Sequence, residues 1–315
     1  MIEGEDLELF ERSLRNATDQ HTGEALDAAL AEIGWHDALS FDTRAAVSRL
    51  FELQGEAGAT SSALDHVVAS AIGYELDGAT AVAFPAIGTD EPPGRFDGER
   101  IVLRGVATVT QRSTLVVSRT GDDGQVAAIV KTSSLDVRPV RGIDPWLGFV
   151  ELNGEVGVDV TQPAYWVAAV LRAQLAVGHE LVGASRKALA LAREHALDRI
   201  QFGQPIARFQ AVRHRLAETL VAIETASAVL DAAWLDPSPV TAAMAKATAG
   251  RSARTAARHC QQVLAGIGFT TEHDLHRYVR RILALDQLFG SHTVLTKRFG
   301  EDLLASRTLP RLLPL

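Results

Sequence analysis

The segment from Ala192 to Glu218, which reads AREHALDRIQFGQPIARFQAVRHRLAE, constrains the fold more than any other part of the 315-residue sequence. It joins two Ala- and Leu-rich stretches of helical periodicity, and Gly203 and Pro205 interrupt that periodicity. Gly commonly follows the end of a helix, and Pro is tolerated in the first turn of one. The segment therefore predicts a bend between two long helices, with Arg199 before the bend and Gln210 just after it.

Such a bend offers the groups that bind a phosphate. A guanidinium, free amide groups at the start of a helix and the positive end of a helix dipole would converge there. The structural alternative is an αα-corner in which Arg199 caps the carbonyl groups of the preceding helix. The residues by themselves leave both interpretations open.

Hydrophobic periodicity divides the chain into three parts and predicts an α+β fold that is mainly α. Residues 1–76 have apolar residues at helical spacing and predict N-terminal helices, the last two separated by Gly55 and Gly58. Residues 77–160 contain short β-rich runs between turn clusters such as Gly121–Gly124 and Asn153–Gly154, which predict a β domain of about six strands. Residues 161–315 predict a bundle of four long helices, the last from Asp274 to about Leu304.

Charge and composition limit the classes of partner. The net charge is −8 overall, but it is −14 over residues 1–100 and +7 over residues 161–315. The basic part favours anionic small molecules, whereas the acidic balance and the lack of an aromatic-basic stripe exclude nucleic acid. No membrane is expected, because no apolar run reaches spanning length. The acidic N-terminus and the single cysteine, Cys260, favour the cytoplasm.

Two sequence blocks carry a resemblance to a known family. The first is R-x-Q-F-G-x-P-I-x-x-F-Q-x-x-x-H-x-L-A, from Arg199 to Ala217, and the second is QVLAGIGFT, from Gln262 to Thr270, followed by Tyr278 and Arg280. Together they resemble the acyl-CoA dehydrogenase family. Within it, the chain is similar to the short non-catalytic subunits of heterotetrameric actinobacterial enzymes that act on steroid-derived CoA thioesters.

The resemblance implies FAD as cofactor and N-terminal helices, a central β domain and a C-terminal four-helix bundle as architecture. In the family, FAD lies across two subunits, and the bundle of one subunit contacts the diphosphate and adenosine side of its neighbour's flavin. Ala265 stands where the family usually has Gly, and no metal is expected. The positions that match FAD contacts are Arg199, Gln201, Phe202, Gln210, Gln262, Val263, Ala265, Gly266 and Ser291.

The carboxylate base of the family has no counterpart at either of its known positions. The resemblance places that base at Phe289 or, in other members, at Ala173. Asp286 lies one turn before Phe289 and Glu180 two turns after Ala173, so each shares roughly a face with a lost position. Either is a candidate relocated base, although one helical turn is about 5 Å and a general base needs hydrogen-bond reach.

Three hypotheses about function follow. In the first, the chain is the non-catalytic subunit of a heteromeric FAD-dependent acyl-CoA dehydrogenase, and a partner subunit supplies the base and the acyl pocket. In the second, it is a self-sufficient homo-oligomeric flavoenzyme that uses Asp286 or Glu180. In the third, it is a flavin-free scaffold that keeps the bundle for assembly.

Overall fold

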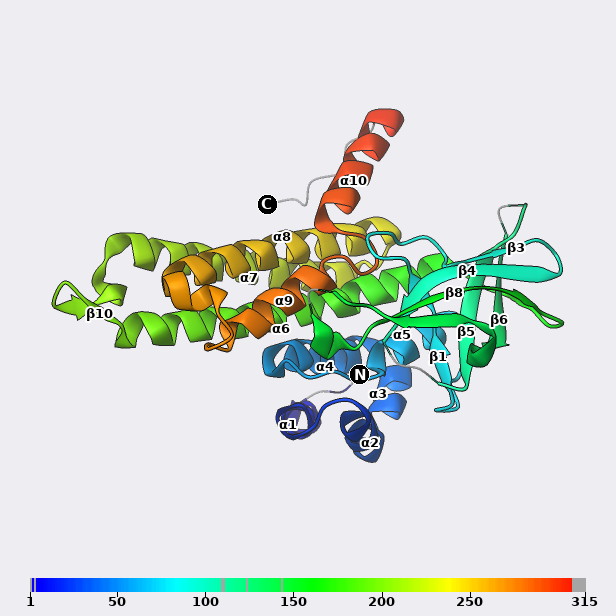
Figure 1. Ribbon diagram of the computed structural model, residues 1–315, viewed down its shortest axis with the longest axis horizontal. Helices are drawn as coiled ribbons and strands as arrows, with labels where there is room; N and C mark the ends of the chain where they lie inside the picture. The colour runs from blue at the N-terminus through cyan, green and yellow to red at the C-terminus, as the bar shows by residue number, and fades with distance from the viewer. Residues whose placement is uncertain (1, 3, 109–110, 123, 143, 308–315) are drawn as a thin grey trace.

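The computed structural model describes residues 2, 4–108, 111–122, 124–142 and 144–307. N-terminal helices, a central sheet and a C-terminal helical bundle follow one another along the chain (Figure 1). The sheet sits at one end of the elongated bundle, and the N-terminal helices lie beside the half of the bundle nearest to it. The predicted fold class, α+β and mainly α, is confirmed.

The N-terminal helices differ from the prediction at two points. An additional short helix, α3, forms because Trp35 is buried and its Nε1 donates to the carbonyl of Ala46. Gly55 does not separate two helices but lies inside one of them, and Gly58 with φ 68° ends it. The helices are α1 Gly4–Gln20, α2 Glu24–Ile33, α3 Trp35–Phe41, α4 Thr43–Ala57 and α5 Ala63–Ala71.

Gly55 has a packing role that its sequence position does not reveal. A Cβ at Gly55 would lie 2.1 Å from the carbonyl oxygen of Glu180, and one at Gly183 would lie 1.9 Å from the carbonyl oxygen of Glu52. Helix α4 therefore crosses α6, Trp166–Asp198, with backbone against backbone. The crossing fixes the N-terminal helices to the bundle.

The central sheet has the strand order β7-β8-β4-β3-β5-β6-β9, with β1 paired to β5 and β2 to β4. Pairing is antiparallel except for β1 and β3, which run parallel to β5. The predicted turn at Asn153–Gly154 is wrong, because both residues pair with β4 inside a continuous strand. The strands are β1 Thr80–Val82, β2 Phe84–Pro85, β3 Gly94–Phe96, β4 Arg100–Ala107, β5 Ser113–Arg119, β6 Gln125–Lys131, β7 Asp136–Pro139, β8 Val150–Gly157 and β9 Gln162–Pro163.

The bundle consists of α6, α7 Gln210–Leu235, α8 Pro239–Leu264 and α9 Leu275–Leu285. The prediction of a single last helix from Asp274 to about Leu304 is wrong. Phe289 and Gly290 have φ of 52° and 92°, and these conformations break the helix. The part after the break is α10, His292–Ser306, which projects away from the bundle (Figure 1). Of its described side chains, Leu295 alone is buried.

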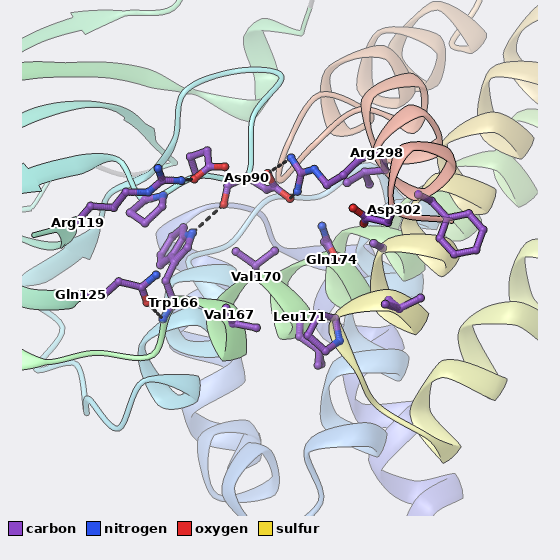
Figure 2. Close-up of a pocket in the computed structure, with 17 residues that line it drawn as sticks. Asp90, Arg119, Gln125, Trp166, Val167, Val170, Leu171, Gln174, Arg298 and Asp302 are labelled. Atoms are coloured by element: carbon purple, nitrogen blue, oxygen red, sulfur yellow. Dashed lines mark hydrogen bonds and ion pairs between the residues drawn. The ribbon is translucent and has the colours of Figure 1, made fainter. Parts of the chain in front are cut away.

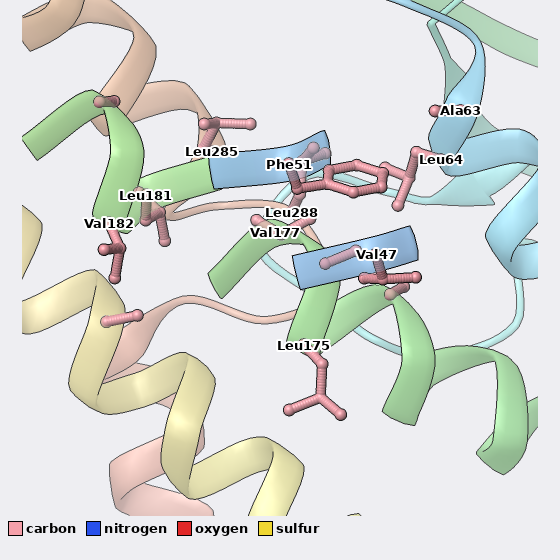
Figure 3. Packing of buried hydrophobic residues seen from close by; sticks show 14 of the residues in the cluster. Val47, Phe51, Ala63, Leu64, Leu175, Val177, Leu181, Val182, Leu285 and Leu288 are labelled. Carbon is pink, nitrogen blue, oxygen red and sulfur yellow. The ribbon is translucent and has the colours of Figure 1, made fainter. Parts of the chain in front are cut away.

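Helix α6 is the centre of the hydrophobic core. Its Val177 and Leu181 pack with Phe51 of α4, Leu64 of α5 and Leu285 of α9 (Figure 3). Within the described part of the chain, α6 is long and apolar enough to cross a membrane by length and composition, but 72% of its apolar window is buried inside the fold. Burial of this kind is typical of a core helix in a bundle.

Candidate functional site

The predicted bend between two helices is present at the free end of the bundle. Arg199 ends α6, and its carbonyl accepts a hydrogen bond of 2.9 Å from the amide of Ile206. Between them, β10 Ile200–Gln201 and β11 Gln204–Pro205 form a two-residue hairpin, and the 3₁₀ turn Ile206–Arg208 leads into α7. The hairpin is the point of the molecule farthest from the sheet (Figure 1).

The turn of this hairpin contains an unusual residue. Phe202 has φ 52°, and its side chain is 91% exposed. Hairpin turns with positive φ favour Asn, Asp or Gly, and a bulky residue there is an outlier. One edge-to-face contact with Phe209, at 6.0 Å between ring centroids, supports the ring. Both the positive φ and the exposure of an apolar ring are unfavourable for the stability of this chain. Phe202 therefore indicates a role other than stabilising the fold.

The arginines around the hairpin have no ion-pair partners. Arg199 is exposed, and among the described residues its guanidinium makes no hydrogen bond or ion pair, so it does not cap the end of α6. The same holds within the described ranges for Arg208, Arg215 and Arg258. Gln210 is exposed at the first turn of α7, where helical amide groups are free. These groups together form an open, electropositive end of the bundle.

The second sequence block lies at the same end. Gln262 is exposed on the last turn of α8, and Ala265 and Gly266 are exposed in the 3₁₀ turn Ala265–Phe269. Val263 is buried, so its side chain belongs to the core. Ala265 has φ 53° and ψ −132°, a conformation that favours Gly. The structure thus gives a physical reason for the Gly that the family usually has there.

Two histidines show that the two blocks are neighbours. The ring of His195, in the last turn of α6, meets the ring of His273 edge to face at 6.1 Å. Burial lowers the pKa of His195, and the positive fields of His273 and Arg199 lower it further. The predicted contacts Arg199, Gln201, Phe202, Gln210, Gln262, Ala265 and Gly266 are therefore grouped at one end of the bundle.

Ser291 is not part of that group. It lies at the opposite end of α8, in the loop between α9 and α10, and it is buried. Its Oγ accepts a hydrogen bond of 3.3 Å from the amide of Val294 and caps α10. Since the flavin of the resemblance spans two subunits, Ser291 stays a predicted contact of a different part of that cofactor.

The position at which the resemblance places the base is filled by an aromatic ring. Phe289 is buried, and its ring packs against Phe84 at 5.4 Å and Trp166 at 6.3 Å. Gln174 of α6 donates from Nε2 to the Phe289 carbonyl at 3.1 Å. The other base position, Ala173, is fully buried in the same core cluster. The described residues thus place no carboxylate at either position.

Asp286 is buried, and its carboxylate makes several hydrogen bonds. Its Oδ2 accepts from Arg254 Nε and is paired with His292 Nδ1, both at 2.8 Å, and its Oδ1 accepts from the His292 amide at 3.1 Å. Burial would raise the pKa of Asp286, but the charge of Lys246 and these hydrogen bonds lower it below its usual value. A carboxylate stabilised in this way is a weak proton acceptor.

Glu180 is held in a second buried cluster. Arg281 donates from Nη1 to Glu180 at 3.1 Å and from Nε to Asp144 at 2.7 Å. The same guanidinium donates to the carbonyls of Ala59 and Gly58. Burial is the main cause of the raised pKa of Glu180, and Arg281 opposes it. The cluster joins the N-terminal helices, the sheet domain and the bundle.

A cavity of about 360 Å³ opens between the sheet, α6, α8 and α10 (Figure 2). Val167, Val170 and Leu171 form its apolar wall, and Gln174, which binds the Phe289 carbonyl, lies at its inner end. At the rim Arg298 binds Asp90 through two hydrogen bonds of 2.6 and 2.7 Å. Gln174 links the cavity to the Phe289 carbonyl, but neither Phe289 nor Ala173 lines it. The lining carboxylates are Asp90, Glu91 and Asp302, which come from neither base position.

Sequence reasoning missed the buried cations Lys246 and Arg281. A signal was available for both, because each occupies a core position of its helix. Lys246 is flanked by the buried Ala242, Ala245 and Ala249 of α8, and Arg281 by Tyr278, Ile282 and Leu285 of α9. A charged residue on the apolar face of a helix needs buried partners.

Comparison with known proteins identifies the class. Residues 166–304 match the family model of the acyl-CoA dehydrogenase C-terminal domain. This part of the chain, the helical bundle with α10, is therefore similar to the C-terminal domain of acyl-CoA dehydrogenases.

Individual relatives agree with this class. The chain is 33% identical over 175 residues to acyl-CoA dehydrogenase IpdE2 of Mycobacterium tuberculosis, covering 55% of this chain and 54% of that protein. It is 36% identical over 118 residues to IpdE2 of Mycolicibacterium smegmatis, covering 38% of each. The chain thus matches about half or less of the length of these curated relatives.

Solved structures with the same fold cover nearly the whole chain. The ChsE4–ChsE5 complex of Mycobacterium tuberculosis superimposes with a TM-score of 0.78 at 20% identity, covering 98% of this chain and 99% of that one. A variant of the Tcur3481–Tcur3483 steroid ACAD gives 0.77 at 21% identity, covering 96% and 99%. At this identity the likeness shows the fold.

Proposed function

We propose that the chain is a subunit of a heteromeric FAD-dependent acyl-CoA dehydrogenase that desaturates a CoA thioester. In this role it contributes flavin-binding residues, and a partner subunit supplies the catalytic base. The observation that carries the proposal is the contrast within one bundle. At its free end most of the predicted FAD contacts are exposed, and Arg199 has no ion-pair partner among the described residues, whereas both base positions are filled by buried apolar residues near the sheet.

The residues at the free end fit a diphosphate from a neighbouring subunit. Arg199 and the start of α7 offer a free guanidinium, free amides and a positive dipole end. Behind them, burial lowers the pKa of His259, and the positive fields of Arg215 and Arg258 lower it further, while Glu218 opposes the shift in part. An excess of positive charge in such a place favours binding of an anion.

Bound FAD would supply the acceptor for a hydride from Cβ of the thioester. The residues of this chain would hold and orient the partner's flavin from its diphosphate and adenosine side, with Arg199 and Gln210 at the diphosphate and the Gln262 turn beside it. In this chain the buried ring of Phe289 occupies the position at which the resemblance places the base. Proton abstraction from Cα is therefore assigned to the partner's carboxylate.

The relatives support the proposed partner and substrate class. The structural neighbours ChsE4–ChsE5 and Tcur3481–Tcur3483 are complexes of two different chains, and one of them is described as a steroid ACAD. We therefore propose a heterotetramer with a catalytic acyl-CoA dehydrogenase subunit, a steroid-derived CoA thioester as substrate, and a cytoplasmic location.

Two alternative functions depend on other observations. A self-sufficient enzyme would need Asp286 or Glu180 as base, and both are already engaged by arginines in buried clusters. A flavin-free scaffold would leave the unpaired arginines and the exposed Phe202 without a ligand. The geometry therefore favours the heteromeric enzyme over both.

Reconstitution with a partner tests the proposal. The chain would be purified alone and together with an acyl-CoA dehydrogenase chain that keeps the Glu base, and turnover would be followed with an artificial electron acceptor. Turnover is expected only for the pair, and it should be lost when the partner's Glu is changed to Gln. Arg199→Ala should lower flavin retention, whereas Arg12→Ala, an exposed arginine of α1, should not. Turnover by the single chain would overturn the proposal.

A further inference from the structure

The connection between α9 and α10 is held by buried charges as well as by the apolar packing of Leu288 and Phe289. Asp286 is fully buried at the end of α9, and Lys246 of α8 is fully buried beside it. Lys246 Nζ donates to the carbonyl of Asp286 at 3.1 Å and to that of Gly290 at 3.3 Å. One ammonium group therefore ties both ends of the loop to α8.

The carboxylate of Asp286 secures the other side of the loop. It accepts from Arg254, one turn beyond Gly250 on α8, and from both the amide and the ring of His292, the first residue of α10. The Asp286 carboxylate thus binds Arg254 of α8 and the first residue of α10, while Lys246 of α8 binds the backbone carbonyl of Asp286. Hydrogen bonds to charged groups in a buried place are strong and directional.

Gly250 allows Asp286 and His292 to lie close to the backbone of α8. A Cβ on Gly250 would lie 2.3 Å from Asp286 Oδ1 and 3.1 Å from the Cβ of His292. Any side chain at this position would push the carboxylate away from its partners. Gly250 thus belongs to the same arrangement as Lys246 and Arg254.

Helix α10 has little other support at this end. Leu295 is its buried apolar residue among those described, and the Arg298–Asp90 pair ties its second turn to the loop before β3. Apolar packing therefore comes from Leu295 of α10 and from Leu288 and Phe289 of the preceding loop, and the polar contacts add to it.

We infer that Asp286, with Lys246 and Arg254, is a positioning residue that orients Ser291 and the first turn of α10 for the flavin shared with the partner subunit. This inference rests on the proposed function. It assigns to Asp286 a role different from that of a relocated base, because all of its interactions point to the loop and to α8.

The test uses Asp286→Asn, Lys246→Met and Gly250→Ala in the complex with the partner, with Glu301→Gln as the matched control. Glu301 is an exposed carboxylate of α10, so its change to an amide leaves the loop intact. Hydrogen exchange at residues 291–297 should become about tenfold faster in the three variants, since each loses charged hydrogen bonds. Exchange in α6 should not change.

Flavin binding and turnover separate positioning from catalysis. For Asp286→Asn, FAD should dissociate about tenfold faster, as expected for the loss of one charged hydrogen bond, while turnover per bound flavin stays within about twofold. Loss of turnover with flavin fully retained would identify Asp286 as a base and overturn the inference. Unchanged exchange at residues 291–297 in all three variants would also overturn it.

The exchange measurement does not depend on flavin. If the wild-type complex bound no flavin, the proposed function would fail, and exchange in the same variants would still decide whether the buried charges hold α10. The two claims can therefore fail separately.

Discussion

The two ends of the helical bundle use the same kinds of residues in opposite ways. Near the sheet, Arg281 and Asp286 are buried and fully paired, and Phe289 is packed between other rings. At the free end, Arg199 is exposed and has no ion-pair partner in the part of the chain that the structure describes, and Phe202 is almost completely exposed. The groups near the sheet stabilise the fold of this chain. The groups at the free end are not needed for its stability. The difference indicates where a ligand or partner is to be expected.

The largest effect is predicted for Arg281→Met. The change leaves Asp144 and Glu180 buried without their cation, and loss of one partner of a buried pair costs about 3–5 kcal/mol. Urea denaturation should show a correspondingly lower free energy of unfolding, with Arg12→Met as the control. A loss below about 1 kcal/mol, the size expected of an exposed ion pair, would remove the contrast between the two ends.

A pH-dependent effect, smaller for each pH unit, is predicted for Asp65. Burial raises its pKa from 3.8 to about 7, and hydrogen bonds from the Val82 amide and Thr108 oppose the shift only in part. Because the folded-state pKa is raised, the contribution of Asp65 is full below pH 3.8 and is lost as the pH rises to about 7. The free energy of unfolding should fall by up to about 1.4 kcal/mol per pH unit in this window.

Asp65→Asn isolates this contribution. The amide keeps the size of the side chain and carries no charge, so the difference in unfolding free energy between wild type and variant should change with pH between about 4 and 7. Parallel curves for the two proteins over this range would contradict the assignment.

At the free end, Ala265→Gly should stabilise the chain slightly. A φ of 53° is less favourable for an L-residue than for Gly, so the change should raise the free energy of unfolding. The greater conformational freedom of Gly in the unfolded chain offsets part of this stabilisation. Thermal unfolding should show a gain of about 0.5–1 kcal/mol. A loss of stability would mean that the Ala265 methyl group has a packing role, although its side chain is exposed.

The smallest effect on stability is predicted for Phe202→Asn. This substitution is the sharpest test of the difference between the two ends of the bundle. Relief of the positive φ is offset by loss of the contact with Phe209, so the free energy of unfolding should change by less than about 0.5 kcal/mol. Flavin retention by the complex with the partner should nevertheless fall. Unchanged retention would show that the exposed ring has no role in the assembly.

The sequence was sufficient to predict the bend at the free end but not the loop between α9 and α10 near the sheet. Gly203 and Pro205 interrupt a clear periodicity, and the bend lies where they stand. The break before α10 was missed because Leu285, Leu288 and Phe289 continue the apolar spacing of α9. Only Gly290 marked it, and a single Gly within a helical pattern is commonly tolerated.

Long-range contacts explain the other omissions. The partners of Arg281 lie 101 and 137 residues away, and a helix pattern gives no information about which buried carboxylates will meet it. The strand order of the sheet likewise depends on pairings between distant segments, such as β4 with β8. The site residues at the free end were predicted from local motifs, and their assignment to FAD stays a prediction.

Flavin content per chain tests the central claim most directly. Absorbance near the flavin band would be compared with protein concentration for the chain alone and for its complex with a catalytic acyl-CoA dehydrogenase subunit. We predict no retained flavin for the chain alone, and flavin in the complex that is lost on Arg199→Ala. Stoichiometric flavin in the chain alone, together with turnover, would contradict the account and show that this chain builds a complete active site.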